Sequence, residues 1–387
     1  MAMFERTNEN KVLRDPVHGY IHISYQVIWD CLNTKEFQRL RRIHQLGGNY
    51  MVYHTAEHSR FSHSLGVYEI IRRMCEEVED ISSSLTEFEK IQVMCAGLIH
   101  DLGHGPFSHM FENILHKNHE EITQTLILDE NTQIHQALKR AHKDLPSLCA
   151  SILNHTHPNS MLSQMISSQL DADRMDYLLR DAYETGTSYG KFDLERILRT
   201  LRISNGILCI KESGMHTIED YIMARYHMYW QVYLHPDARS YEICIELFIK
   251  RYKEIRKSIK IEALEILFEP FNSDNFYLMD ENRLFYGFQQ ALHCEDETLK
   301  DLANRILNRI LLDWIELEED SSLHFEKSTY CVIENCKDLN CLPYQEKENP
   351  IWILNTKNQC IPLSDCSEIV RALLRMDINH KKRVFYN

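Results

Sequence analysis

The chain lacks any uninterrupted apolar run that approaches the length of about 20 residues needed to cross a membrane. Its first residues, MAMFERTNENKVLRDP, contain no apolar stretch of the kind found in a secretory signal. The 12 cysteines are scattered and show no disulfide-framework spacing. We therefore expect a cytoplasmic protein with reduced thiols and no membrane partner.

Glycine and proline are also scarce, at 12 and 9 of 387 residues, and no segment is repeated or low in complexity. This composition excludes fibrous and disordered proteins and is typical of a globular one. Basic residues are outnumbered, 43 against 57 acidic ones, which gives a net charge of −14. Such a balance disfavours nucleic acid as a partner, although a small basic pocket can still bind a single nucleotide.

Apolar residues recur at helical spacing along most of the chain, which predicts a mainly α fold. A Gly-Gly pair after Leu46 ends one predicted helix, and Thr86-x-x-Glu89 has the form of a capping box that begins another. The predicted helices cover roughly 34–46, 63–79, 86–99, 119–128, 131–141, 146–154, 161–184, 217–234, 238–258 and 296–312.

Short β elements are expected at three places. Residues 11–24 alternate apolar and polar side chains around a His-Gly turn signal, and two β-prone runs flank Asn205-Gly206. Residues 351–365 have the pattern of short strands joined by a turn. We therefore predict small β-hairpin additions to a helical core, with a helical plus short-strand C-terminal region.

Histidine is concentrated in the first part of the chain, where 15 of the 21 residues precede position 158. Four residues there and nearby have the chemistry of a metal site: His63, His100, Asp101 and Asp173. Neutral imidazoles combined with carboxylates suit a first-row transition metal better than an all-oxygen magnesium site. The four residues are far apart in sequence, so the fold must bring them together.

A single His-Asp pair is usually a surface feature or a simple hydrogen-bonded pair. The segment HDLGHGPFSH is harder to explain by packing, because three His, one Asp, two Gly and one Pro follow an apolar helix directly. The glycines allow the chain to turn sharply and to present His104 and His109 to the same cavity as His100. We therefore interpret this segment as part of a metal site.

At these residues the sequence resembles the HD superfamily. More narrowly, it is similar to the HD-domain deoxynucleoside triphosphate triphosphohydrolases, which include bacterial enzymes and a vertebrate enzyme that adds a sterile-alpha-motif domain. The resemblance extends from about residue 15 to 235 through DPVHGYIHI, EFQRLRRIHQLGG, HSRFSHSLGVYE, AGLIHDLGHGPFSHMFE, HEEIT, DADRMDYLLRDAYETG and ARYHMYWQVYLHP. It implies an HD core with an N-terminal hairpin at 1–257 and a helical and β region for assembly at 258–387.

The resemblance implies a reaction in which a deoxynucleoside triphosphate is cut at the α-phosphorus into deoxynucleoside and triphosphate. It implies Mn, Fe, Ni or Zn at the four metal ligands, with Mg on the nucleotide phosphates. Other implied partners are a GTP or dNTP activator and further copies of the chain in a homodimer or homotetramer.

The resemblance also implies roles for individual residues. In catalysis, His104 would contact the α-phosphate, His109 would protonate the leaving 5′ oxygen, and His119 would pair with Glu112. The residues implied in substrate binding are Arg60, Arg174, Tyr177 and Arg225 at the phosphates, Gln45 and Asp181 at the sugar 3′-hydroxyl, and Tyr233 against a 2′-hydroxyl. Those implied in activator binding are Asn33, Gln38 and Arg41.

Three positions depart from the family pattern. Glu112 stands where the vertebrate relatives have Asp, and Arg174 replaces a Lys, which changes a point charge into a planar fork. Asn33 stands where an Asp would read the guanine edge, so activation by a guanine nucleotide stays open.

Two alternatives compete with this interpretation. Another HD hydrolase, acting on a monophosphate, a cyclic nucleotide or an alarmone, would share the metal ligands without needing Arg60, Asp181 and Tyr233 together. A non-catalytic nucleotide-sensing protein would have lost turnover, but none of the four ligands is missing here.

Overall fold

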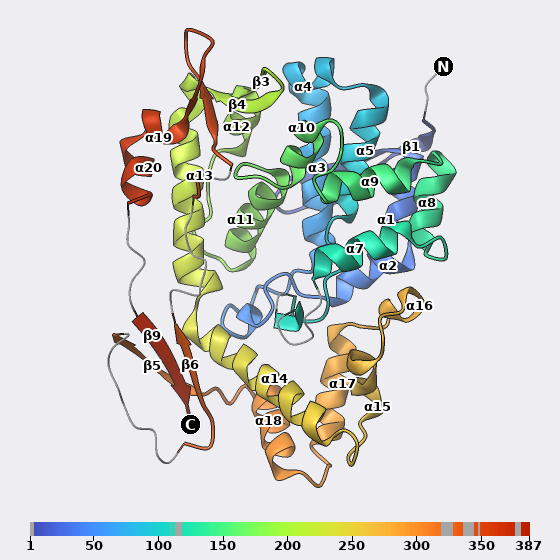
Figure 1. Cartoon of the computed structure of the whole chain (residues 1–387), viewed down its shortest axis with the longest axis vertical. Coiled ribbons are helices and arrows are strands. Elements are labelled where there is room, and N and C mark those ends of the chain that lie inside the picture. The colour runs from blue at the N-terminus through green and yellow to red at the C-terminus, as the bar shows by residue number, and fades with distance from the viewer. Residues whose placement is uncertain are drawn as a thin grey trace.

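The computed structural model describes residues 4–108, 110–112, 118–318, 328–335, 344–346, 349–375 and 381–387. Helices make up the bulk of the molecule and small sheets lie at its edges (Figure 1). The predicted mainly α class with small β additions is therefore confirmed. Within the described part of the chain, no helix combines the length and the apolar character needed to cross a membrane.

Three helices form the centre of the core and position the candidate metal ligands. They are α3 (Arg60–Glu77), α5 (Glu87–Ile99) and α11 (Ala172–Glu184), and α3 packs against both of the others. The predicted capping box at the start of α5 is present: the Thr86 hydroxyl accepts from the Glu89 N–H, and the Glu89 carboxylate accepts from the Thr86 N–H.

Other helices surround this centre. The described ones of the HD core are α1 (Gln26–Leu32), α2 (Lys35–Arg39), α4 (Glu79–Ser84), α7 (His119–Leu128), α8 (Gln133–Ala141), α9 (Leu145–Leu153), α10 (Ser160–Ile166), α12 (Leu194–Thr200) and α13 (Met215–Met228). A π-helical segment, Tyr229–Tyr233, continues α13. Such segments are rare and often lie at functional sites.

The single helix predicted over 161–184 is wrong, because two helices, α10 and α11, occupy this range. The break has a local cause in Asp171. Its carboxylate accepts from the N–H of Arg174 at 2.7 Å and from the N–H of Ser168 at 2.6 Å, which favours an extended backbone at 171 and begins a new helix. Asp173 therefore lies in the first turn of α11 and not in the middle of a long helix.

The C-terminal region adds a helical layer below the core (Figure 1). This layer consists of α14 (Pro236–Ile255), the last helix of the range predicted for the core, together with α15 (Glu262–Glu265), α16 (Ser273–Phe276), α17 (Glu281–Ala291) and α18 (Glu297–Asn308). The other two C-terminal helices, α19 (Leu363–Cys366) and α20 (Glu368–Leu373), lie beside α13 instead (Figure 1). Helices α15 to α17 were not predicted. The sequence does carry a start signal for α17, because Asp280 caps this helix by accepting from the Arg283 N–H at 3.1 Å.

The β elements form three small sheets. The hairpin of β1 (Arg6–Asp15) and β2 (Gly19–Tyr25) confirms the prediction for 11–24. The second sheet has the order β3 (Leu201–Ser204), β4 (Ile207–Lys211), β7 (Trp352–Leu354) and β8 (Cys360–Pro362), and β4 pairs with β7 in parallel. The third sheet, β5 (Asp313–Glu318), β9 (Lys381–Tyr386) and β6 (Cys331–Asn335), was not predicted.

Candidate metal centre

The fold brings together the four residues proposed as metal ligands. His63 comes from α3, His100 ends α5 and is followed by Asp101, and Asp173 lies at the start of α11. The Nε2 atom of His63 lies 3.0 Å from Asp173 Oδ1 and 3.7 Å from Asp101 Oδ2. The Nε2 atom of His100 lies 3.2 Å from Asp101 Oδ1 and 3.7 Å from Asp173 Oδ1.

Hydrogen bonds at the far side of each imidazole favour the tautomer that binds a metal. His63 Nδ1 lies 2.8 Å from Asp176 Oδ2, and His100 Nδ1 lies 2.8 Å from the carbonyl oxygen of Gly97. Since both acceptors take a proton from Nδ1, each Nε2 is the nitrogen that can offer its lone pair to an ion. Both Nε2 atoms are buried and have no hydrogen-bond partner among the described residues.

These distances fit a bound cation. Ligand atoms at about 2.0–2.2 Å from one ion are roughly 3–3.6 Å from one another at tetrahedral or octahedral angles. Three of the side chains are deeply buried, whereas that of Asp173 is 35% exposed. The site is therefore open on the side of Asp173, as a catalytic site must be to admit water or substrate.

The charges around the site also favour a cation. Burial alone would lower the pKa of His63, but the hydrogen bonds and charges of Asp173 and Asp176 outweigh it and raise the pKa to about 10. Burial alone would raise the pKa of Asp101, but the charges of His100 and of its other cationic neighbours hold that pKa well below its usual value. The carboxylates therefore stay ionised, and the negative charge that holds a proton on His63 would hold a divalent cation as well.

A second group of residues, Asp101, His104 and His119, also brings its ligand atoms close together. Here, however, the two imidazole rings are stacked, with centroids 3.9 Å apart and planes inclined by only 16°. Nitrogen lone pairs lie in the ring plane, so two nearly parallel rings cannot both point at one ion. Of the two groups found among the described residues, the one with the His63 and His100 rings in edge contact, at 73°, suits a shared ion.

The stacked pair belongs instead to an acid–base cluster beside the metal group. His119 Nδ1 lies 2.8 Å from Glu112 Oε1, and His104 Nδ1 lies 3.6 Å from the same oxygen. The other nitrogen of His104 lies 3.4 Å from Asp101 Oδ1. Burial, reinforced by the charge of Arg60, lowers the pKa of His104 well below its usual value, so its imidazole is neutral. His109 lies outside the described residues.

Sequence reasoning missed the residues that hold His63 in place. Asp176 accepts from His63, and Arg180 donates to Asp176 at 2.9 Å and to Asp15 at 2.8 Å, while His18 Nε2 lies 2.6 Å from Asp176. The signal was present in DADRMDYLLRD, because positions three and seven residues after Asp173 fall on one face of a helix. Gly66 makes room for this network, since a Cβ there would lie 1.8 Å from Asp176 Oδ1.

The segment that follows His100, residues 101–108, has an unusual backbone. Gly103 is packed so closely against α7 that a Cβ would lie 2.0 Å from the carbonyl oxygen of His119. Phe107 and Ser108 both adopt left-handed conformations, with φ of 59° and 53°. Such conformations cost a non-glycine residue roughly 1–2 kcal/mol each, so surrounding contacts must hold this loop. We call residues 101–108 the metal loop.

The proposed substrate residues line two facing elements. Arg174, Tyr177 and Asp181 occupy one face of α11, and Arg225 and Tyr233 come from α13 and the π-helical segment, with the Tyr177 and Tyr233 rings 6.1 Å apart. Asp181 accepts from the Tyr233 hydroxyl at 2.8 Å, and its other oxygen lies 2.7 Å from His58 Nε2.

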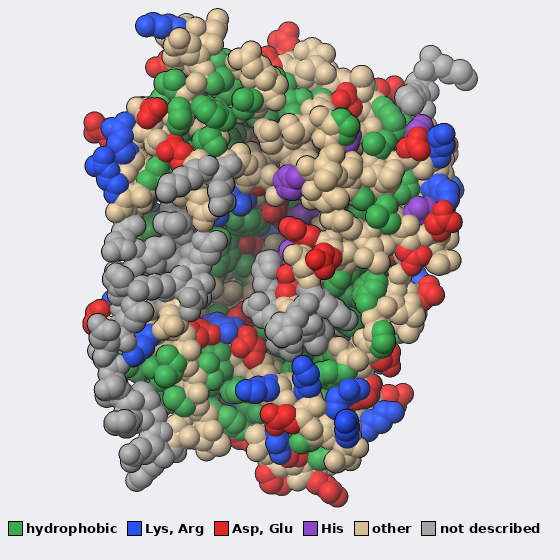
Figure 2. All heavy atoms as spheres, viewed as in Figure 1, with side chains coloured by type: hydrophobic (Ala, Val, Ile, Leu, Met, Phe, Trp, Pro, Cys, Tyr) green, Lys and Arg blue, Asp and Glu red, His purple; other side chains and the backbone are tan. Residues whose placement is uncertain are grey.

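Several polar atoms in this region point to a ligand. Arg174 Nη1 and Gln45 Oε1 are buried and have no hydrogen-bond partner within the described ranges. Arg60, by contrast, is engaged: it donates to Asp101 and, at 3.0 Å, to Ser108 Oγ. Arg225 donates to Gln169 at 3.3 Å. Figure 2 shows His, acidic and basic side chains gathered around a hollow near the middle of this face.

The proposed activator residues lie between the end of α1 and the turn after α2, away from the substrate residues proposed on α11 and α13. Asn33 and Gln38 donate to the carbonyl oxygens of Trp29 and Leu32, and Arg41 donates to Gln38 at 2.9 Å. Arg41 also lies over the Phe61 ring and, with it, lines an open cavity of about 550 Å³. The activator role of these residues stays a prediction.

Comparison with protein-family models gives two matches along the chain. The HD domain matches residues 60–181, and the HD associated region matches residues 192–319. The chain is 42% identical over 394 residues to the uncharacterized protein YwfO of Bacillus subtilis, and the alignment covers 95% of this chain and 90% of that protein.

More distant relatives carry a functional name. The deoxynucleoside triphosphate triphosphohydrolase SAMHD1 of Danio rerio is 30% identical over 285 residues, which are 63% of this chain and 45% of that protein. Among solved structures, a phosphohydrolase from Bacteroides thetaiotaomicron superposes with a TM-score of 0.85 at 26% identity, covering 98% of this chain and all of that one.

Proposed function

Because this chain belongs to the HD-domain family of metal-dependent phosphohydrolases, we propose that it hydrolyses deoxynucleoside triphosphates to deoxynucleoside and triphosphate. In this reaction the oxygen of a water molecule forms a bond to the α-phosphorus, and the bond from that phosphorus to the 5′ oxygen breaks. The 5′ oxygen takes up a proton and leaves as the deoxynucleoside hydroxyl.

One observation carries the proposal: a buried His and Asp group with an open side lies next to a separate cluster of titratable groups. His63, His100, Asp101 and Asp173 would hold a transition-metal ion, of which Mn, Fe, Ni and Zn are candidates. When bound, such an ion polarises a phosphoryl oxygen and lowers the pKa of bound water toward neutrality. The neighbouring residues then have to orient the phosphate and move the protons.

The acid–base cluster supplies groups for both tasks. The neutral imidazole of His104 lies between Asp101 and Glu112, where it can donate a hydrogen bond to an oxygen of the α-phosphate. The carboxylate of Glu112, 2.8 Å from His119 Nδ1, orients the His119 imidazole. His109, which lies outside the described residues, is our proposed proton donor to the 5′ oxygen.

The facing elements α11 and α13 offer a place for the rest of the nucleotide. Arg174, whose Nη1 is a buried donor without a hydrogen-bond partner among the described residues, would bind a phosphate, as would Arg225. Gln45 and Asp181 would bind the sugar 3′-hydroxyl. The Tyr233 hydroxyl, fixed by Asp181, would leave little room for a 2′-hydroxyl and so select against ribonucleotides.

The direct experiment is a product analysis of the purified protein, loaded with each candidate metal, on the four dNTPs with and without GTP. We expect deoxynucleoside and triphosphate in equal amounts, with oxygen from labelled water found only in the triphosphate. Release of monophosphate or pyrophosphate would overturn the proposed substrate position, and turnover of a cyclic nucleotide or alarmone alone would overturn the substrate class.

Two variants separate the metal group from its surroundings. Asp173→Asn should lose both metal and turnover, because it replaces a carboxylate ligand by a neutral amide. Asp171→Asn is the matched control, since Asn also caps helices well and this residue faces the backbone of α11. Metal loss of equal size in both variants would mean that Asp173 acts through folding and not as a ligand.

A further inference from the structure

We propose that Glu281 of α17 is a positioning residue for the metal loop, so that the C-terminal region completes the active centre as well as serving in assembly. The proposal rests on the proposed function insofar as His104, on that loop, contacts the substrate. The contacts that support it are separate from the metal ligands and come from a helix that sequence reasoning missed.

The Glu281 side chain is hydrogen-bonded to the metal loop. Its Oε1 accepts from the N–H of Phe107 at 3.2 Å and from the N–H of His44 at 2.9 Å, and its Oε2 is hydrogen-bonded to His44 Nδ1. The residue is only 2% exposed. A buried carboxylate is costly unless its oxygens are satisfied, and here two backbone N–H groups satisfy Oε1 while the His44 imidazole satisfies Oε2.

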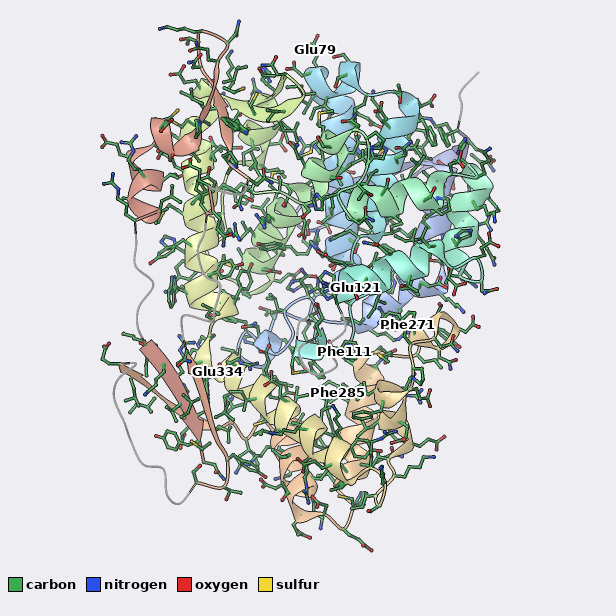
Figure 3. The ribbon with its side chains drawn as sticks, viewed as in Figure 1. Glu79, Phe111, Glu121, Phe271, Phe285 and Glu334 are labelled. Atoms are coloured by element: carbon green, nitrogen blue, oxygen red, sulfur yellow. The ribbon has the colours of Figure 1, made fainter. Side chains whose placement is uncertain are left out.

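A second contact from the same helix reaches the same loop residue. Phe285 lies one turn after Glu281, and its ring packs at 5.9 Å from that of Phe107. Figure 3 shows Phe285 on the side of α17 that is directed toward the core segment bearing Phe111. Phe107, which has a left-handed backbone, is therefore held at both its N–H and its ring by α17.

A third set of contacts, from Arg39 in the core, also restrains the metal loop. Arg39 is completely buried and donates to the carbonyl oxygens of Leu102 and His104, both at 2.6 Å, and to that of Met279, at 2.8 Å. Met279 lies two residues before Glu281. One guanidinium thus ties the two ends of the His104 turn to the segment that begins α17.

The consequence is that α17 fixes the orientation of His104. A loop with two left-handed residues relaxes toward ordinary backbone conformations unless it is restrained. If the Phe107 end is released, the His104 imidazole can move relative to Asp101 and Glu112. The metal ligands would be less affected, because His63 and Asp173 lie on helices and Asp101 is next to Leu102, whose carbonyl Arg39 still holds.

The test compares Glu281→Ala, Glu281→Gln and Asp280→Ala in the full-length, metal-loaded protein. The Gln amide oxygen can still accept from Phe107 and His44, so Glu281→Gln is the conservative rescue. Asp280→Ala removes the cap of α17 and the pair with Arg42, at the same helix end, without touching the metal loop. Metal content, kcat, KM and backbone hydrogen exchange at Phe107 are measured for each.

We expect Glu281→Ala to lower kcat by about 10²-fold, with KM and metal content changed by less than about threefold, because small misplacements of a reacting group have effects of this size. Exchange at the Phe107 amide should become faster. Glu281→Gln and Asp280→Ala should both stay near the wild-type kcat.

Two results would overturn the proposal: an unchanged kcat in Glu281→Ala, or an equal loss in Asp280→Ala, which would indicate general destabilisation. Failure of the proposed function is distinguishable from both. If the wild-type protein hydrolyses no dNTP, hydrogen exchange at Phe107 still decides whether Glu281 restrains the loop, and unchanged exchange in Glu281→Ala rejects it.

Discussion

At the scale of single residues, the chemistry of the site depends on which nitrogen of each imidazole carries the proton. His63 and His100 both direct Nδ1 to an oxygen of the protein, a carboxylate in one case and a helix carbonyl in the other. This leaves two buried Nε2 atoms facing the oxygens of Asp101 and Asp173, where they can bind an ion. The residues behind the ligands therefore matter almost as much as the ligands.

Asp176 gives a residue-scale prediction. We expect Asp176→Asn to weaken metal binding by about 10–100-fold, because an amide accepts a proton from His63 less strongly and can also present its NH2 group to Nδ1. Metal affinity would be measured by competition with a chromogenic chelator.

The matched control for this change is Asp15→Asn. Asp15 also pairs with the buried Arg180 but does not touch His63, so this variant removes a similar charge without changing the imidazole. Its metal affinity should stay within about threefold of wild type, since its contact with the ligand is indirect. Equal weakening in both variants would contradict an effect that acts through His63.

At the scale of elements, α17 meets the core at His44. Burial alone would lower the pKa of His44, but hydrogen bonds and charges from Glu281 and Glu57 outweigh it and raise the pKa from 6.5 to about 9. Below about pH 6.5 the imidazole is protonated in the folded and unfolded chains alike, so its stabilising effect is complete. As the pH rises toward 9 the unfolded chain binds fewer protons, and this contribution is lost.

The resulting prediction concerns His44→Gln, which cannot be protonated. The wild-type advantage in unfolding free energy should be largest at about pH 6 and should shrink by up to about 3 kcal/mol by about pH 9.5, at about 1.4 kcal/mol per pKa unit. Urea unfolding of both proteins across this range measures it. A difference that does not vary with pH would show that the His44 charge contributes nothing to the junction.

Elements with strong local signals were predictable from the sequence, and those with long-range causes were not. The Thr86 capping box and the Asn205-Gly206 turn use neighbouring residues, so the pattern alone indicated α5 and the β3–β4 hairpin. The sheet of β5, β9 and β6 pairs segments that are distant along the chain, which no local pattern reports. The Asp171 break was visible only as an Asp within a helical pattern.

The candidate site likewise contains residues that a local sequence pattern indicates and residues that only long-range packing brings into it. The residue types of the metal group and its neighbours in HDLGHGPFSH indicated a candidate ion site from the sequence alone. The restraint by Glu281 did not appear, because it depends on packing between segments more than 170 residues apart. Asp176 is an intermediate case. Helical spacing puts it one turn after Asp173, but this can be used only once α11 is known to begin at Ala172.

At the scale of the whole molecule, the HD core and the C-terminal region share buried polar contacts. Arg39 donates to carbonyl oxygens on both sides of the junction between the two regions. If the regions separated, its guanidinium would lose part of these acceptors, which is costly for a buried charge. We expect the full chain to unfold in one cooperative transition. Far-UV circular dichroism and tryptophan fluorescence should give coincident urea curves, and two resolved transitions would contradict this.

The most direct measurement is anomalous diffraction from crystals of the protein loaded with Mn or Ni. The account predicts a single strong peak bonded to His63 Nε2, His100 Nε2, Asp101 and Asp173, at about 2.0–2.3 Å from each. A peak between Asp101, His104 and His119, or no peak at the four ligands, would contradict it.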